Sequence, residues 1–229
     1  MKNPKVKFVI SADKDIENYI LFKKYSTGGI KFLNMFLPEK LHGKKDETIK
    51  KYVQDNFNLR KEEIDKNVKK IKKEWQNIEK KYFDLVNKIF KNHPWSKGKY
   101  IGYASVFDMY PRNIKEKTFF FPALRQSKFP IMVTGHELLH FIFFDYLAKK
   151  YNYKGTKKHG KKAEYVWQIS EVFNSVIENW SPYYKILKFD GAKKKPYTGV
   201  KYFEKMRKLW QENQDIDFLL DNYFKYEPK

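Results

Sequence analysis

The most constraining feature of this sequence is an apolar run, residues 129–147, with ionisable side chains near its middle. Drawn as a helix, the run has apolar residues on almost every side, which is typical of a helix buried all round. His136, Glu137 and His140 interrupt it. Burying two imidazoles and a carboxylate is costly unless they are paired or bind a metal. The run therefore predicts a core helix built around a polar site, and its charges argue against a membrane span.

These polar residues form the pattern His-Glu-x-x-His. Residues four apart on an α-helix differ by only about 40° around its axis, so His136 and His140 face the same side, one turn apart. Two neutral imidazoles and one further protein ligand leave the fourth position of a zinc ion for water. Glu137 lies about 100° away and is placed to take a proton from that water. We predict a Zn²⁺ site with His136 and His140 as ligands and Glu137 as general base.

Residues 129–177 resemble the active-site region of the zincin metallopeptidases. The resemblance implies a zinc-dependent hydrolase that cleaves peptide bonds. It also implies that an extended substrate pairs with an edge strand upstream of the active-site helix, and residues 100–107 and 118–121 have the composition of such strands. The pattern departs from the metzincin branch, because Phe143 and Tyr146 replace its glycine and third histidine. The chain has no cysteine, which excludes the peptide deformylases.

The third metal ligand has several candidates. In the gluzincin branch a glutamate on a downstream helix completes the site, and Glu171, 31 residues after His140, resembles it. Glu171 shares the polar side of its helix with Glu164 and Glu178, so it is expected to face either solvent or a cleft. His159 resembles instead the third ligand of SprT-like proteases, which act on proteins bound to DNA. We predict Glu171, with His159, Glu164 and Glu178 as alternatives.

The resemblance also implies a tyrosine or histidine that stabilises the oxyanion of the reaction. Four residues near the motif are candidates for this role: Tyr165, Tyr183, Tyr184 and His159.

Charge is the other prominent feature of the composition. The chain has 48 Lys+Arg against 27 Asp+Glu, a net charge of +21, which is the kind of excess that nucleic-acid-binding proteins carry. Only four of the 48 cations are arginines, although arginine is the better residue for bidentate recognition of phosphates and bases. We attribute most of the charge to composition. A non-catalytic, basic nucleic-acid-binding module is the alternative, and residues 149–162 are the basic cluster nearest the site.

Periodicity along the chain predicts an α+β class, mostly helical with a small antiparallel or mixed sheet and a zincin-like arrangement. We expect one metallopeptidase-like domain over residues 1–229, with a helix-rich half, 1–95, and a catalytic half, 96–229. The expected strands are 5–10, 100–107 and 118–121, and the expected helices 13–25, 46–90, 129–148, 163–179, 200–212 and 215–224. The expected partner is a peptide or protein substrate, with nucleic acid less favoured. No signal peptide or membrane span is expected, so a cytoplasmic location is predicted.

Overall fold

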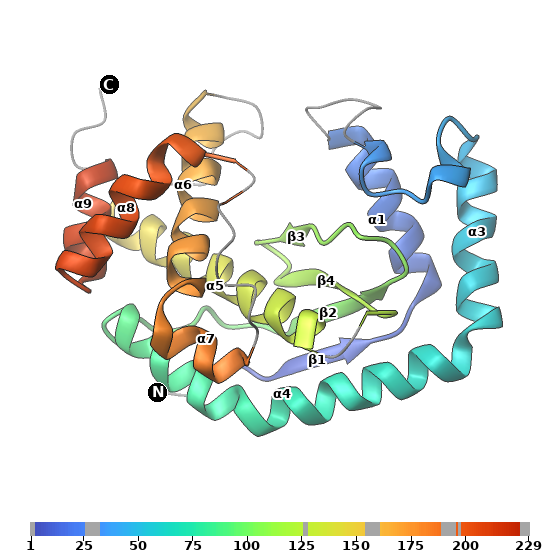
Figure 1. The fold of residues 1–229 in the computed structure, drawn as a ribbon, viewed down its shortest axis with the longest axis horizontal. Coiled ribbons are helices and arrows are strands. Elements are labelled where there is room, and N and C mark those ends of the chain that lie inside the picture. The colour runs from blue at the N-terminus through green and yellow to red at the C-terminus, as the bar shows by residue number, and fades with distance from the viewer. Residues whose placement is uncertain are drawn as a thin grey trace. The chain divides into compact units, whose positions relative to one another are not determined.

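A computed structural model describes residues 3–25, 33–125, 128–153, 161–188, 196 and 198–224. The chain is mostly helical with one small mixed sheet, in agreement with the predicted α+β class (Figure 1). Its elements are β1 (Val6–Val9), α1 (Ala12–Tyr25), η1 (Glu39–Leu41), α3 (Asp46–Leu59), α4 (Lys61–Ile89), β2 (Tyr100–Ser105), β3 (Arg112–Asn113), β4 (Thr118–Pro122), α5 (Lys128–Lys150), α6 (Lys161–Glu178), α7 (Ser181–Leu187), α8 (Val200–Glu212) and α9 (Ile216–Phe224).

Contacts within the chain divide it into two compact units, which are described separately. The sheet unit comprises Pro4–Asn77 and Gly98–Thr134. The helical unit comprises Met1–Asn3, Ile78–Lys97 and Gly135–Lys229. Each unit is therefore assembled from segments that are distant in the sequence.

The sheet has the strand order β1-β2-β4-β3. β1, β2 and β4 run parallel, and the two-residue β3 is antiparallel to the start of β4. β2 is hydrogen-bonded on both sides, so the expectation that residues 100–107 form an edge strand is wrong. The reason is that the N-terminal strand, itself expected from the sequence, pairs with β2 and covers that side. β3 covers the outer side of β4 at Thr118 and Phe119.

Gly102 of β2 leaves room for aromatic side chains of the neighbouring strand β4. A Cβ atom on Gly102 would lie 2.7 Å from Cζ and 2.9 Å from Cε2 of the Phe119 side chain. Phe119 and Phe121 are fully buried. Any larger residue at position 102 would displace these rings.

Helix α1 packs against α3 and β2, and buried polar groups fix it there (Figure 1). The Asp15 carboxylate accepts a hydrogen bond from the backbone N–H of Val106 at 2.8 Å. The Asn18 amide donates to the carbonyl of Met109 at 3.2 Å and to Asp15 at 3.3 Å. Burial raises the pKa of Asp15 to about 6, and its hydrogen bonds only partly offset that effect.

The helix expected over residues 46–90 is two helices, α3 and α4, separated at Arg60. The predicted apolar stripe of α4 is confirmed, because most of its members are buried. Six members of the stripe lie in the core: Ile64, Val68, Ile71, Trp75, Tyr82 and Ile89. The other two, Ile78 and Leu85, are half-buried.

In the helical unit, α6 packs against α7 and α8. The sequence missed α7, because Trp180-Ser181-Pro182 was interpreted only as the end of α6. Pro182 instead lies in the first turn of α7, where a missing N–H costs nothing. Gly199, at φ 65°, begins α8 close to α6: its Cβ position is 2.8 Å from Cγ2 of Val172. None of the helices among the described residues has both the length and the apolar character that crossing a membrane requires.

Candidate metal centre

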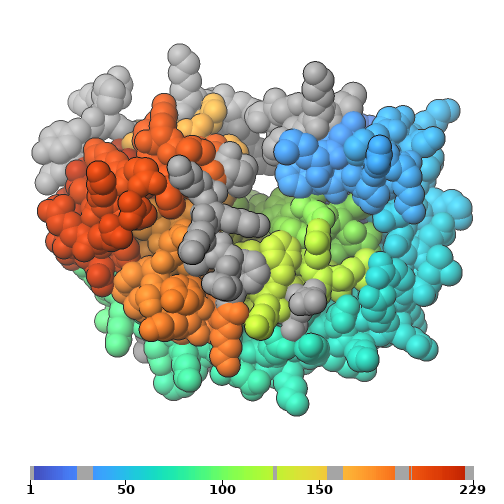
Figure 2. All heavy atoms as spheres, viewed as in Figure 1, coloured from blue at the N-terminus to red at the C-terminus, as the bar shows by residue number. Residues whose placement is uncertain are grey.

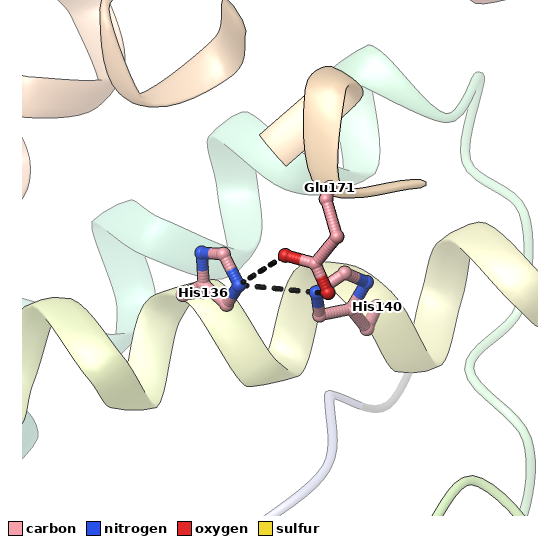
Figure 3. A group of neighbouring side chains, drawn as sticks. All are labelled: His136, His140 and Glu171. Atoms are coloured by element: carbon pink, nitrogen blue, oxygen red, sulfur yellow. Dashed lines mark hydrogen bonds and ion pairs between the residues drawn. The ribbon is translucent and has the colours of Figure 1, made fainter. Parts of the chain in front are cut away.

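Two histidines of α5 point to the same side of that helix, as their spacing predicts (Figure 3). The Nε2 atoms of His136 and His140 are 3.1 Å apart. His140 is fully buried, whereas the His136 side chain keeps 21% of its exposure. Solvent therefore reaches the pair from the His136 side.

Glu171 of α6 faces both imidazoles with its carboxylate (Figure 3). Its Oε2 lies 3.3 Å from Nε2 of His136, and its Oε1 lies 3.3 Å from Nε2 of His140. One ligand atom from each of the three residues can be chosen so that all lie within 4.8 Å of one another. The Glu171 side chain is only 2% exposed, so of the two expected environments solvent is wrong. The polar side of α6 at this position faces α5.

The spacing of the two imidazole nitrogens suits a small tetrahedral cation. Zinc binds nitrogen and oxygen ligands at about 2.0–2.1 Å, which places neighbouring ligand atoms about 3.3 Å from each other. The Nε2 atoms of His136 and His140, 3.1 Å apart, are close to that value, and each lies 3.3 Å from a different oxygen of Glu171. Two imidazoles and one carboxylate also form a donor set that zinc prefers. The three side chains thus form a group that could hold a metal ion, with donor atoms that suit zinc.

Glu178, one of the alternative ligands, contacts the other nitrogen of His136. Its Oε1 is 2.7 Å from Nδ1. A carboxylate at Nδ1 keeps the proton on that nitrogen and leaves the Nε2 lone pair free for a metal. Glu178 is not part of the group of three converging ligand atoms. Its position is that of a residue that orients a metal ligand.

Backbone contacts fix the first turn of the motif. The Asn174 amide donates to the carbonyl of His136 at 2.8 Å, and the Tyr82 hydroxyl donates to the carbonyl of Gly135 at 2.7 Å. Asn174 follows Glu171 by three residues and precedes Glu178 by four. This spacing places all three residues on one stripe of α6. Glu171 supplies the carboxylate that faces the imidazoles, Asn174 the contact to the backbone of α5, and Glu178 the contact to Nδ1 of His136.

Gly135 allows two tyrosines to approach the motif closely. A Cβ atom there would lie 3.0 Å from the Tyr183 hydroxyl oxygen and 3.2 Å from Cε2 of Tyr82. Burial holds the pKa of both tyrosines well above the ordinary value, so both hydroxyls stay protonated. Tyr183, proposed above as an oxyanion-stabilising candidate, is 1% exposed and packs behind the motif.

The electrostatic environment of the centre favours a cation. Burial lowers the pKa of His136, but the charges and hydrogen bonds of Glu178 and Glu171 outweigh that effect and raise it well above the ordinary value. The same two carboxylates attract any positive charge placed between the imidazoles, whether a proton or a metal ion. A proton and a metal therefore compete for this position.

Other residues singled out in the sequence have different surroundings. Glu137 is buried beside its two histidines in α5, at 4% exposure. Glu164 is exposed and accepts a 3.3 Å hydrogen bond from Gln168, so it is not part of the centre. The Tyr165 hydroxyl donates to the carbonyl of Tyr223. His159 lies outside the described residues, as does the rest of the stretch 154–160 within the basic cluster 149–162.

The motif spacing predicted His136 and His140 but contained no signal for two further contacts, those of Asn174 and Tyr82. Helical periodicity places Asn174 on a polar face of its helix, one turn after Glu171, where an amide can either support a ligand or meet solvent. Tyr82 lies on the apolar stripe of α4, where a tyrosine is indistinguishable from a packing residue.

Comparison with known proteins finds no match to this chain among protein-family models, curated proteins or solved structures.

Proposed function

We propose that this chain is a zinc-dependent metallopeptidase of the zincin type. The observation that carries the proposal is the convergence of His136, His140 and Glu171, which bring one ligand atom each within 4.8 Å of one another. A structural zinc site is usually closed by four protein ligands, whereas a hydrolytic one keeps an open position. Three protein ligands and solvent access at His136 favour the hydrolytic kind.

Each residue has a distinct role in the proposed reaction. His136, His140 and Glu171 hold the metal, and Glu178 fixes the tautomer of His136. Bound zinc would lower the pKa of a water molecule to near 7 and polarise the substrate carbonyl. Glu137 takes the proton of the attacking water and transfers it to the departing amine, as a general base and then a general acid.

Zinc content tests the ligand assignment. We expect one zinc per chain in the wild type and a large loss of zinc in Glu171→Gln, because an amide oxygen is a weaker ligand than a carboxylate. Glu164→Gln is the matched control, since it makes the same change on an exposed turn of the same helix. Full zinc occupancy in Glu171→Gln would contradict the assignment. Loss of zinc in His159→Ala but not in Glu171→Gln would support the SprT-like alternative.

Cleavage of an unfolded, fluorescently labelled protein tests the reaction. We expect activity in the zinc-loaded wild type, no activity after chelation, and recovery when zinc is restored. Glu137→Gln should keep its zinc and lose at least two orders of magnitude in rate, the usual contribution of a general base. Zinc-loaded Glu137→Gln with wild-type activity would refute the mechanism. A zinc-loaded wild type without activity on any peptide would refute the function.

A further inference from the structure

A second surface on this chain has a composition that the metal centre does not explain. Five lysines lie within eight consecutive residues of α4, and all five are exposed: Lys66, Lys69, Lys70, Lys72 and Lys73. At about 100° per residue, four of them fall in a sector about 100° wide, with Lys72 beside it. We call these five residues the α4 lysine stripe. Helix α4, drawn in teal, lies at the surface in Figure 2.

Acidic partners neutralise some lysines of this chain but not these. Lys14, Lys51 and Lys80 each form an ion pair of 3.3 Å or less with a carboxylate three or four residues away, and Lys50 has one at 4.0 Å. No carboxylate of the described residues lies within 4.0 Å of any lysine in the stripe. This holds even though two acids, Glu62 and Asp65, stand at helical spacing from lysines of the stripe.

The lysines of the stripe also repel one another. Lys66 has lysines at three and four residues beyond it, and so does Lys69. Like charges at these spacings are close neighbours on a helix, and each pair destabilises it by about 0.2–0.5 kcal/mol. A polyanion bound along this face would remove the repulsion, whereas free α4 has to bear it.

We propose that the α4 lysine stripe binds the phosphate backbone of double-stranded nucleic acid. The stripe places five positive charges along about 10 Å of helix, or about one per 2 Å, and a duplex carries one negative charge per about 1.7 Å of its axis. The two charge densities are thus well matched. Lysine ammonium groups contact phosphates as point charges and do not read bases, so binding is independent of sequence. The proposal does not depend on the metal centre.

The other side of α4 argues against a membrane as the partner. Amphipathic helices bind bilayers by inserting an apolar face below the headgroups. The apolar face of this part of α4 is already buried in the core of the sheet unit, through Ile64, Val68 and Ile71. Only the charged stripe is free to bind, and it has no apolar side chain to insert.

Fluorescence anisotropy with a labelled 20-base-pair duplex tests the proposal. The test variant replaces Lys66, Lys69, Lys70 and Lys73 with Gln, which has nearly the same helix propensity as Lys. The control variant makes the same four-charge change at the ion-paired Lys14, Lys50, Lys51 and Lys80. Circular dichroism and thermal unfolding check that both variants remain folded. If the fourfold stripe variant does not fold, the milder double variant Lys66→Gln/Lys70→Gln replaces it.

We expect the stripe variant to bind at least about tenfold more weakly than the wild type at 100 mM salt. Each lost phosphate contact lowers the slope of log K against log salt by about 0.9, so four contacts lower it by about 3.6. The control variant should lose less than about threefold and keep the wild-type slope. Equal losses in the two variants would overturn the proposal, since bulk charge would then explain the binding. Absence of duplex binding would overturn it too, as would stripe-dependent binding only to vesicles with 30% anionic lipid.

Discussion

At the scale of single residues, His136 is the most constrained side chain of the metal centre. Its Nε2 faces His140 and Glu171, and its Nδ1 faces Glu178. Its backbone carbonyl accepts a hydrogen bond from the Asn174 side-chain amide. An imidazole held at both nitrogens has one orientation and one tautomer available to it. The cost of orienting this imidazole is met during folding, so it would not weaken the binding of a metal.

Removing the charge of Glu178 should weaken metal binding without abolishing it. We expect Glu178→Gln to lower zinc affinity by about 10- to 100-fold, the usual effect of losing a carboxylate that orients a metal-binding histidine. Competition with a chromophoric chelator measures the affinity, and Glu164→Gln again provides the control on the same helix. Unchanged affinity in Glu178→Gln would show that His136 needs no orienting carboxylate.

The sequence predicted part of this centre and could not predict the rest. The spacing of His136, Glu137 and His140 is local, so a single helix determines which of them face the same side. Whether Glu171 is buried depends on which element packs against α6, and helical periodicity contains no information about that. The same limit left Glu178 as an alternative ligand, although it contacts the opposite nitrogen of His136.

At the scale of elements, the contact between β2 and β4 depends on the absence of a side chain at Gly102. We expect Gly102→Ala to lower the free energy of unfolding by about 1–3 kcal/mol, because its methyl group would overlap the Phe119 ring. Urea denaturation measures the loss. The double variant with Phe119→Leu should be more stable than the sum of the two single effects predicts, because the smaller side chain leaves room for the methyl group. Strict additivity would contradict this explanation.

The attachment of α1 to the end of β2 should depend on pH through Asp15. Its pKa of about 6 in the folded chain exceeds the ordinary value of 3.8, so the folded state holds the proton more tightly. Stability is therefore lost as pH rises from about 4 to about 6, by at most roughly 3 kcal/mol.

Asp15→Asn should remove this contribution. Urea denaturation of the metal-free chain at pH 4.5 and 7.5 compares the variant with the wild type, and Asp13→Asn, an exposed change in the same turn, is the control. A pH dependence that is identical in wild type and Asp15→Asn would show that Asp15 is not the titrating group.

The elements that the sequence missed have short or weak local signals. The break between α3 and α4 at Arg60 contains neither glycine nor proline, so no residue type marks it. β3 has only two residues and exists through its pairing with β4. By contrast, α8 was predicted at its observed bounds, because a glycine precedes it and its apolar residues have a clear helical period.

At the scale of the whole molecule, the helical unit is not a continuous piece of chain. Its core joins the end of α4 to helices that follow much later: the ring of Phe90 packs 5.7 Å from that of Phe173 and 5.5 Å from that of Tyr146. Lys91, just beyond α4, forms ion pairs with Asp215 at 2.5 Å and Asp217 at 2.8 Å. The halves suggested by the sequence, 1–95 and 96–229, separate these partners.

A fragment of residues 96–229 should therefore fail to form the metal centre, although it contains every predicted ligand. It lacks Tyr82, whose hydroxyl donates a hydrogen bond to the Gly135 carbonyl. It also lacks Phe90, whose ring packs against Tyr146 of α5 and Phe173 of α6. We expect a poorly dispersed amide NMR spectrum and no stoichiometric zinc, with the full chain as the reference. A folded, zinc-loaded fragment would show that residues 78–95 are dispensable.

The divided layout of the helical unit has a consequence for synthesis of the chain. Tyr183, which packs against Tyr82, follows Lys97 by 86 residues. At 5–20 residues per second, a ribosome needs roughly 4–17 s to make that stretch. During this time the apolar side of the end of α4 has left the ribosome without its partners. The nascent chain therefore exposes an apolar segment of α4 for several seconds before all the residues of the candidate metal centre have been made.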